Sequence, residues 1–249
     1  MRGLIFCAEF NLKAYICKNY RYNESMNAQI ELYHGSPIVM EHPFLGGGKR
    51  WNDYGSGFYC TESTELAFEW ARPGTEPGFA NKYVLDTAGL TTLYLNRKPY
   101  HILNWLAILL QNRKFALPMG IANDARDYVL AEFLPEYEGY DLIVGYRADD
   151  SYFSFAKAFL HGGISLEQLS SAMKLGNPGE QVVLKSEKAF EQLLFLGAAP
   201  VPDIYATRRK ARDDAARESF YQTRESPFGG ILISDIIREK WKNDDARLQ

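Results

Sequence analysis

The chain has 249 residues, of which 46% are hydrophobic, and a formal net charge of -3 at pH 7. This length and composition support a globular protein with a sizeable buried core. The apolar runs are shorter than the roughly 20 residues of a membrane-spanning helix, and the first residues lack the apolar region of a secretory signal. We therefore expect a cytoplasmic protein that does not bind a membrane. The charge excludes a global attraction to nucleic acid but not a local basic groove.

The metal-binding residue types are few and scattered. Cys7, Cys17 and Cys60 are odd in number and lack the spacing of metal ligands, which argues against a disulfide framework and against a zinc site. The 4 histidines are too dispersed for a zinc motif. We expect reduced thiols and no metal.

In chain order, residues 1–25 precede Met26 and form the expected N-terminal extension. The main domain is expected at residues 26–200, because no repeat or Pro/Gly/Ser-rich linker divides it. Its strand-like runs, mostly bounded by Gly, Pro, Asn or Asp, are 30–34, 58–61, 82–86, 93–95, 141–146 and 181–185. Residues 100–113 have the apolar periodicity of a helix, and Ser165 with Gln168 forms a capping box that begins another. Strands and helices do not alternate regularly, so the predicted fold class is α+β.

The C-terminal extension, residues 201–249, is expected to pack on the main domain. From Asp203 to Arg224 it is dense in charges of both signs, which predicts a solvated helix with ion pairs four residues apart. A partner-binding arm is the alternative. The closing run Ile231–Ile237 is apolar enough to pack back onto the domain.

Two glycine clusters fail as known nucleotide-binding motifs. Near Gly46, Pro43 stands where a P-loop has its first glycine, and Arg50 stands where it has the Ser or Thr that binds Mg²⁺. In the second cluster, which begins at Gly55, Cys60 replaces the third glycine of a dinucleotide fingerprint, and a strand rather than a helix follows.

Three blocks remain, in this order: YHGS at 33–36, DYGSGFY at 53–59 and GEQVVL at 179–184. With the segments 140–150 and 181–190, they resemble the ADP-ribosyltransferase superfamily of diphtheria toxin and the poly(ADP-ribose) polymerases, in particular a bacterial branch of it. The resemblance spans about residues 30–196. It implies split antiparallel β-sheets around an NAD cleft, with helical insertions.

The first two blocks are the expected NAD site. The resemblance implies that His34 holds ribose hydroxyls and that Gly35 pairs with the nicotinamide carboxamide, with Ser36, Gly57 and Phe58 as further contacts. Tyr59 can stack on the nicotinamide ring, since the glycines before it permit a close approach. From the residues alone, a core histidine and a hairpin with a core tyrosine are the alternatives.

The third block is the expected catalytic element. An amide or carboxylate oxygen near the ribose stabilises the charge that develops there in the transition state. Glu180 and Gln181 cannot both face the cleft, because adjacent strand residues point to opposite sides. The bacterial branch favours Gln181, and the polymerase pattern favours Glu180. Glutamine cannot act as a general base, so we expect transfer of a single unit.

Three further residues are candidates with competing interpretations. Asp149 and Asp150 follow a predicted strand and could deprotonate an acceptor, or form an Asx turn or helix cap. Trp70 lies at helical spacing from Leu66, and we expect it in the core rather than at a cofactor.

The sequence thus predicts a mono-ADP-ribosyltransferase with NAD as co-substrate. Such bacterial proteins resemble toxins or effectors, which implies a macromolecular acceptor, protein or nucleic acid, and an antitoxin or immunity protein as partner. An NAD glycohydrolase and a catalytically inactive nucleotide-binding module are the alternatives.

Overall fold

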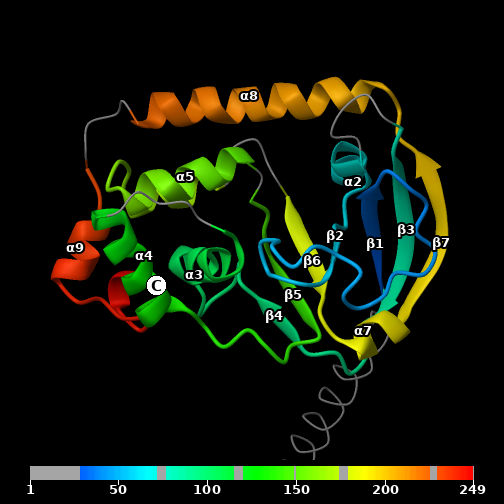
Figure 1. The fold of residues 1–249 in the computed structure, drawn as a ribbon, viewed down its shortest axis with the longest axis horizontal. Coiled ribbons are helices and arrows are strands. Elements are labelled where there is room, and N and C mark those ends of the chain that lie inside the picture. The colour runs from blue at the N-terminus through cyan, green and yellow to red at the C-terminus, as the bar shows by residue number, and fades with distance from the viewer. Residues whose placement is uncertain are drawn as a thin grey trace, which may run out of the picture.

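The computed structural model describes residues 29–71, 77–114, 120–148, 150–173, 179–224 and 229–248. The expected N-terminal extension and the candidate Asp149 lie outside these ranges. The described residues form an α+β fold with two β-sheets and surrounding helices, which confirms the predicted class (Figure 1). No helix among them is long and apolar enough to cross a membrane.

The first sheet is antiparallel, with the strand order β1-β3-β7. Its strands are β1 (Gln29–Ser36), β3 (Phe79–Asp86) and β7 (Leu193–Pro200). The strand-like runs 30–34 and 82–86 correctly predicted β1 and the second half of β3, whereas β7 was not predicted. Residues 193–196 of β7 are an unbroken apolar run with no period of two, so only the pairing with β3 identifies a strand there.

The second sheet has the order β2-β6-β5-β4. Its strands are β2 (Phe58–Cys60), β6 (Glu180–Leu184), β5 (Leu142–Tyr146) and β4 (Thr92–Tyr94). The expectation of purely antiparallel sheets is wrong here, because β4 and β5 are parallel. The chain between them passes through two helices, which is long enough to bring β5 back in the same direction.

Helix α3 (Ile102–Asn112) is the centre of the larger hydrophobic core. The predicted apolar face is present, but every residue from Leu103 to Leu110 is buried, because the second sheet and several helices surround the helix. One of those helices, α4 (Ile121–Phe133), was not predicted. A smaller core cluster, which includes Leu32, Tyr83 and Leu184, lies between the two sheets.

The remaining helices cover the upper face and the ends of the fold. They are α2 (Thr64–Ala71), α5 (Asp150–Leu160), α6 (Leu166–Ala172), α7 (Glu187–Glu191), α8 (Ile204–Arg224), α9 (Ile233–Arg238) and the 3₁₀ turn η1 (Ala246–Leu248). The capping box of Ser165 and Gln168 is present at the start of α6, as predicted.

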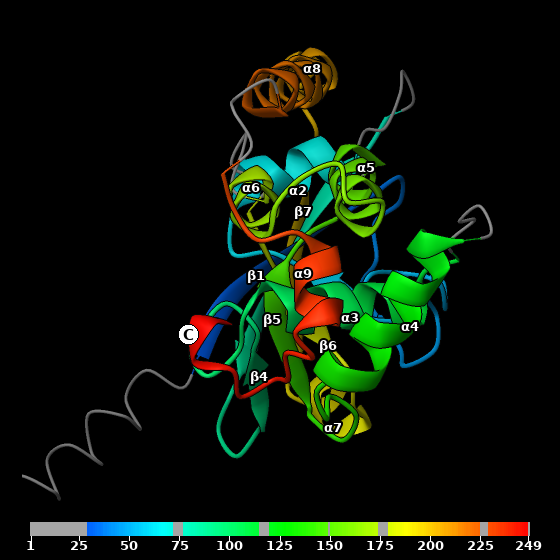
Figure 2. The ribbon, with the colours of Figure 1, turned by 90° about the vertical axis from the view of Figure 1, so that its left-hand side faces the viewer.

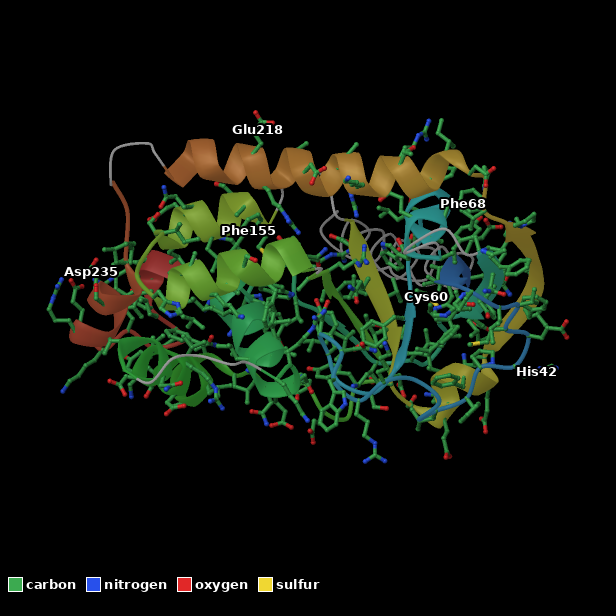
Figure 3. The ribbon with its side chains drawn as sticks, turned by 45° about the horizontal axis from the view of Figure 1, so that its top comes forward. His42, Cys60, Phe68, Phe155, Glu218 and Asp235 are labelled. Atoms are coloured by element: carbon green, nitrogen blue, oxygen red, sulfur yellow. The ribbon has the colours of Figure 1, made fainter. Side chains whose placement is uncertain are left out.

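The charged helix α8 lies as a separate layer above α2, α5 and α6 (Figure 2). Glu218 projects from its outer face (Figure 3). In α9, Ile233 and Ile236 are buried in the larger core.

The two sheets are joined by a pair of backbone hydrogen bonds between Tyr33 and Thr61. The N–H of Tyr33 on β1 donates to the carbonyl of Thr61 at 2.8 Å, and the N–H of Thr61 donates to the carbonyl of Tyr33 at 2.9 Å. Past Tyr33, no described residue of the β2 segment pairs with β1. The sheets therefore separate next to His34 and Gly35.

Candidate functional site

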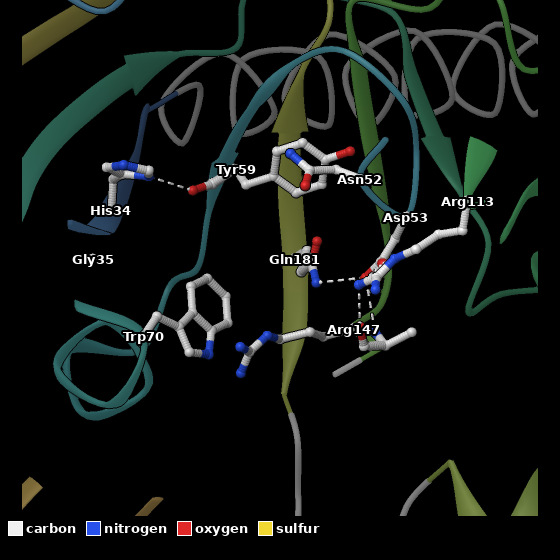
Figure 4. A pocket seen from close by; sticks show the side chains of 10 residues that line it. His34, Gly35, Asn52, Asp53, Tyr59, Trp70, Arg113, Arg147 and Gln181 are labelled. Carbon is white, nitrogen blue, oxygen red and sulfur yellow. Dashed lines mark hydrogen bonds and ion pairs between the residues drawn. The ribbon is translucent and has the colours of Figure 1, made fainter. Parts of the chain in front are cut away.

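A cavity of about 300 Å³ lies at this split between the sheets (Figure 4). Its wall brings together all three sequence blocks, and is formed by His34, Gly35, Asn52, Asp53, Tyr59, Trp70, Arg113, Arg147, Ala148 and Gln181. A second, more apolar cavity of about 280 Å³ shares three of these residues and is bounded by the loop around Phe44. The two cavities thus meet along His34, Asn52 and Tyr59.

His34 borders both cavities, and its orientation is fixed. The Nδ1 atom lies 2.7 Å from the carbonyl oxygen of Tyr59, which only accepts, so Nδ1 carries a proton. The ring also packs against Phe58, with centroids 4.4 Å apart. Burial lowers the pKa of His34, so the ring is neutral at neutral pH and its Nε2 is a hydrogen-bond acceptor. Among the described residues, nothing donates to that Nε2.

The lowered pKa of His34 predicts a pH-dependent contribution to stability. Below the ordinary value of 6.5, unfolded His34 takes up a proton that the folded protein resists, so this contribution is lost as the pH falls. We expect the free energy of unfolding, measured with urea at pH 7.5 and 5.5, to fall less in His34→Gln than in the wild type. The same pH dependence in both proteins would contradict this assignment.

Gly35 offers its backbone to the cavity. Because Tyr33 points its N–H and C=O toward Thr61, the same groups of Gly35, two residues on, point to the same side of β1. No described residue bonds to them. A Cβ atom at this position would lie 2.2 Å from the carbonyl of Ala67, so glycine is also required for α2 to pack on β1.

The turn that carries Tyr59 is held rigidly. The Tyr59 hydroxyl donates to the carbonyl of Gly55 at 2.7 Å and accepts from the N–H of Tyr54 at 3.0 Å. The ammonium of Lys185 donates to the carbonyls of Tyr54 and Ser56, both at 2.6 Å. Gly55 has a φ of 75°, a conformation that favours glycine. These bonds fix the Tyr59 ring as a wall between the two cavities.

Gln181 lies at the back of the cavity and is 4% exposed. Its amide Nε2 donates to Oδ2 of Asp53 at 3.2 Å, whereas its Oε1 is buried with no hydrogen-bond partner. A buried acceptor without a donor costs free energy, so its presence in a cavity points to a ligand that donates to it. Gln181 therefore presents an acceptor to whatever binds there.

Glu180 lies on the opposite side of β6, as the strand period predicts. It is exposed, accepts a hydrogen bond from Asn96, and borders a separate groove next to α2 and α8. It does not line the cavity that contains Gln181. Of the two catalytic candidates, only Gln181 faces the other two blocks.

Trp70 corrects one expectation. The helical spacing from Leu66 is confirmed by α2, but Trp70 is half-buried and lines the cavity, so the prediction of a core residue is wrong. Ala67 and Ala71 are the buried residues of α2, which leaves Trp70 at its side, over the split. Its indole N–H has no partner among the described residues. The guanidinium of Arg147 lies 4.7 Å from the ring centroid.

The other candidates lie less directly at this site. Ser36 is buried, and its hydroxyl bonds to the backbone of Ile38 and to Asn81, so it does not line either cavity. Gly57 and Phe58 line only the apolar cavity. Asp150 is the first residue of α5. Among the described residues, no cluster of His, Cys, Asp and Glu is suited to a metal ion.

Five residues of this wall were not among the sequence-based candidates. Asp53 appeared only as the first residue of the second block, and the other four are Asn52, Arg113, Arg147 and Ala148. The sequence did give a reason to consider Asp53, because an aspartate next to a glycine turn often forms hydrogen bonds that hold the turn. The two arginines have no such local pattern, since they reach the cavity only through the packing of α3 and the end of β5.

The fold and this site define a class of α+β protein with a polar and aromatic cavity at the split between two small sheets. Residues 30–195 match the family described as "Protein of unknown function (DUF3990)". Because the match covers more than half of the chain, the protein belongs to this family, and the matched segment includes every residue of the cavity wall. No curated protein and no solved structure matches the chain significantly.

Proposed function

We propose that the protein is an NAD-dependent mono-ADP-ribosyltransferase whose substrate binds in the cavity at the split. The buried, unpaired Oε1 of Gln181 carries the proposal, because it lies in the same cavity as two aromatic rings, a free backbone edge and two arginines. A cavity of about 300 Å³ is at the lower end of the range for small-molecule sites.

The nicotinamide half of NAD fits the part of the cavity between Gly35, Tyr59 and Trp70. A carboxamide has one donor and one acceptor end, and the unpaired C=O and N–H of Gly35 match both. The rings of Tyr59 and Trp70 give the flat nicotinamide aromatic surfaces to stack on.

The ribose and the diphosphate fit the polar remainder. A neutral His34 accepts a hydrogen bond from a ribose hydroxyl through Nε2. Gln181 accepts one from the hydroxyl next to the reacting carbon through Oε1. Arg147 supplies positive charge to the same cavity, which favours the two phosphates, whereas the charge of Arg113 is paired with the carboxylate of Asp53.

The reaction breaks the bond between the anomeric carbon and the nicotinamide nitrogen, and nicotinamide leaves as a neutral molecule with the electron pair. Gln181 stabilises the positive charge that develops on the ribose, because its carbonyl dipole is already oriented before the reaction. A nucleophilic oxygen or nitrogen of the acceptor then bonds to the same carbon and loses its proton. Gln181 cannot accept that proton, which favours one transfer over chain elongation.

Asp149 and Asp150 are the candidates for an acceptor-side base, and a cap at the start of α5, which begins at Asp150, is the alternative role. By resemblance to bacterial toxins and effectors, the acceptor is a macromolecule, protein or nucleic acid, and an antitoxin or immunity protein is the expected partner. The alternative role of the charged helix α8, that of a partner-binding arm, would place such a partner on its exposed charged surface.

The test is incubation of the purified protein with adenylate-labelled NAD and a cell extract, followed by protease or nuclease treatment. Label on a macromolecule supports the transferase, and the treatment that releases it gives the acceptor class. Free ADP-ribose alone would indicate an NAD glycohydrolase, and binding without turnover a nucleotide-binding module.

A further inference from the structure

The carboxylate of Asp53 is buried beneath the cavity and is surrounded by donors. The side chain is 4% exposed. Its Oδ1 accepts from Nε of Arg113 at 2.8 Å and forms an ion pair with the same guanidinium at 2.7 Å. Its Oδ2 accepts from the N–H of Ala148 at 2.8 Å and from Nε2 of Gln181 at 3.2 Å. Each of these neighbours donates a hydrogen bond to Asp53, and an ionised carboxylate can accept all of them.

This arrangement determines the orientation of the Gln181 amide. A side-chain amide has a donor end and an acceptor end of nearly equal size, and rotation by a half turn exchanges them. With the ends exchanged, Oε1 of Gln181 would face Oδ2 of Asp53, two acceptors at hydrogen-bond distance in a buried place. Asp53 therefore excludes that rotamer and leaves Oε1 toward the cavity.

We infer that Asp53 is a positioning residue, which holds Gln181 so that its carbonyl oxygen, and not its amide nitrogen, meets the ribose. The inference rests on the proposed function. It assigns the second sequence block two tasks, since Asp53 at its start orients the catalytic amide and Tyr59 at its end provides the ring.

One consequence separates this site from one built around a catalytic glutamate. A glutamate at position 181 would place a second carboxylate against Asp53, and like charges at this separation in a buried site repel strongly. Gln181→Glu is thus expected to lower turnover, although a carboxylate serves the polymerase-like members that the chain resembles. Asp53→Asn should partly rescue Gln181→Glu, because it removes the negative charge that repels the new carboxylate.

The experiment compares the wild type with Asp53→Asn, Gln181→Glu and the double variant. The matched control is Asp141→Asn, since Asp141 also accepts several hydrogen bonds, from Thr91 and Ser186, but lies outside the cavity. The kinetic readout is kcat and KM for release of nicotinamide from NAD. The binding readout is the Kd of benzamide, which has the flat ring and carboxamide of nicotinamide but no ribose. A thermal melt of each variant checks folding.

We expect Asp53→Asn and Gln181→Glu each to lower kcat by about 10- to 100-fold. This range is taken by analogy from metal sites, where removal of a group that orients a ligand has an effect of that size. The double variant should regain at least part of that loss, and Asp141→Asn should match the wild type. Benzamide should bind all four variants like the wild type, because it does not reach Gln181. A general structural defect would instead weaken benzamide binding and lower the melting temperature together.

Wild-type kcat in Asp53→Asn, or a double variant no better than both single ones, would overturn the positioning role while leaving the proposed function in place. A wild type that neither binds benzamide nor releases nicotinamide overturns the proposed function, and this inference with it. Gln181→Glu leaves Asp53 in place, so it remains informative if Asp53→Asn fails to fold. A kcat for Gln181→Glu at or above that of the wild type would then overturn the inference.

Discussion

Gln181→Ala is expected to lower kcat for NAD turnover by about 100-fold or more, the effect of removing one preorganised group that stabilises charge in a transition state. The substitution removes the only buried acceptor oxygen of the described cavity wall that has no partner. The loss should fall mainly on kcat, because the contact strengthens as charge develops on the ribose. Benzamide binding should not change.

Glu180→Ala is the matched control, since it removes the neighbouring side chain from the same strand. Glu180 is exposed and lies on the other side of β6, so kcat should stay within about twofold of the wild type. Equal losses in both variants would show that β6 matters only for folding. A larger loss at Glu180 would assign the catalytic role to the carboxylate and reject Gln181.

Trp70→Ala is expected to weaken benzamide binding about tenfold or more. Stacking of a flat base on an aromatic side chain contributes about 1–3 kcal/mol, and 1.4 kcal/mol corresponds to a factor of ten in Kd. Calorimetric titration of benzamide measures this directly. Because Trp70 is half-buried at the side of α2 and not in the core, the variant should keep its fold.

Trp51→Ala is the control for this substitution. Trp51 also has a cation over its ring, with the Lys114 ammonium 4.2 Å from the centroid, but it is 56% exposed and lines neither cavity. Its benzamide affinity should equal that of the wild type. If Trp70→Ala binds benzamide as well as Trp51→Ala does, the nicotinamide does not stack on Trp70, and its place in the proposed site is wrong.

Much of the site could be predicted from short-range patterns. The strands that carry His34, Tyr59 and Gln181 show in the local composition and spacing, and the period of two separates Glu180 from Gln181 without a structure. The capping box at Ser165 and the charged helix α8 are equally local features, and both are present as predicted. Each depends on interactions between residues close together in the chain.

Other features depend on residues that are far apart in the sequence. The parallel pairing of β4 with β5, and the assignment of β7 as a strand, follow from partners about 50 or more residues away rather than from their own periodicity. Helix α4 has only a weak apolar pattern, so its packing against α3 identifies it.

The sequence by itself determined the three blocks, their order and that Glu180 and Gln181 face opposite sides of the third block's strand, because these follow from local periodicity and composition. Only the tertiary structure decided that Trp70 lines the cavity, that Arg113 and Arg147 reach it, and that Asp53 orients Gln181. The physical reason is the separation of the partners. The hydrogen bond from Gln181 to Asp53 joins residues 128 positions apart, and no local pattern encodes which donor meets which acceptor across that distance.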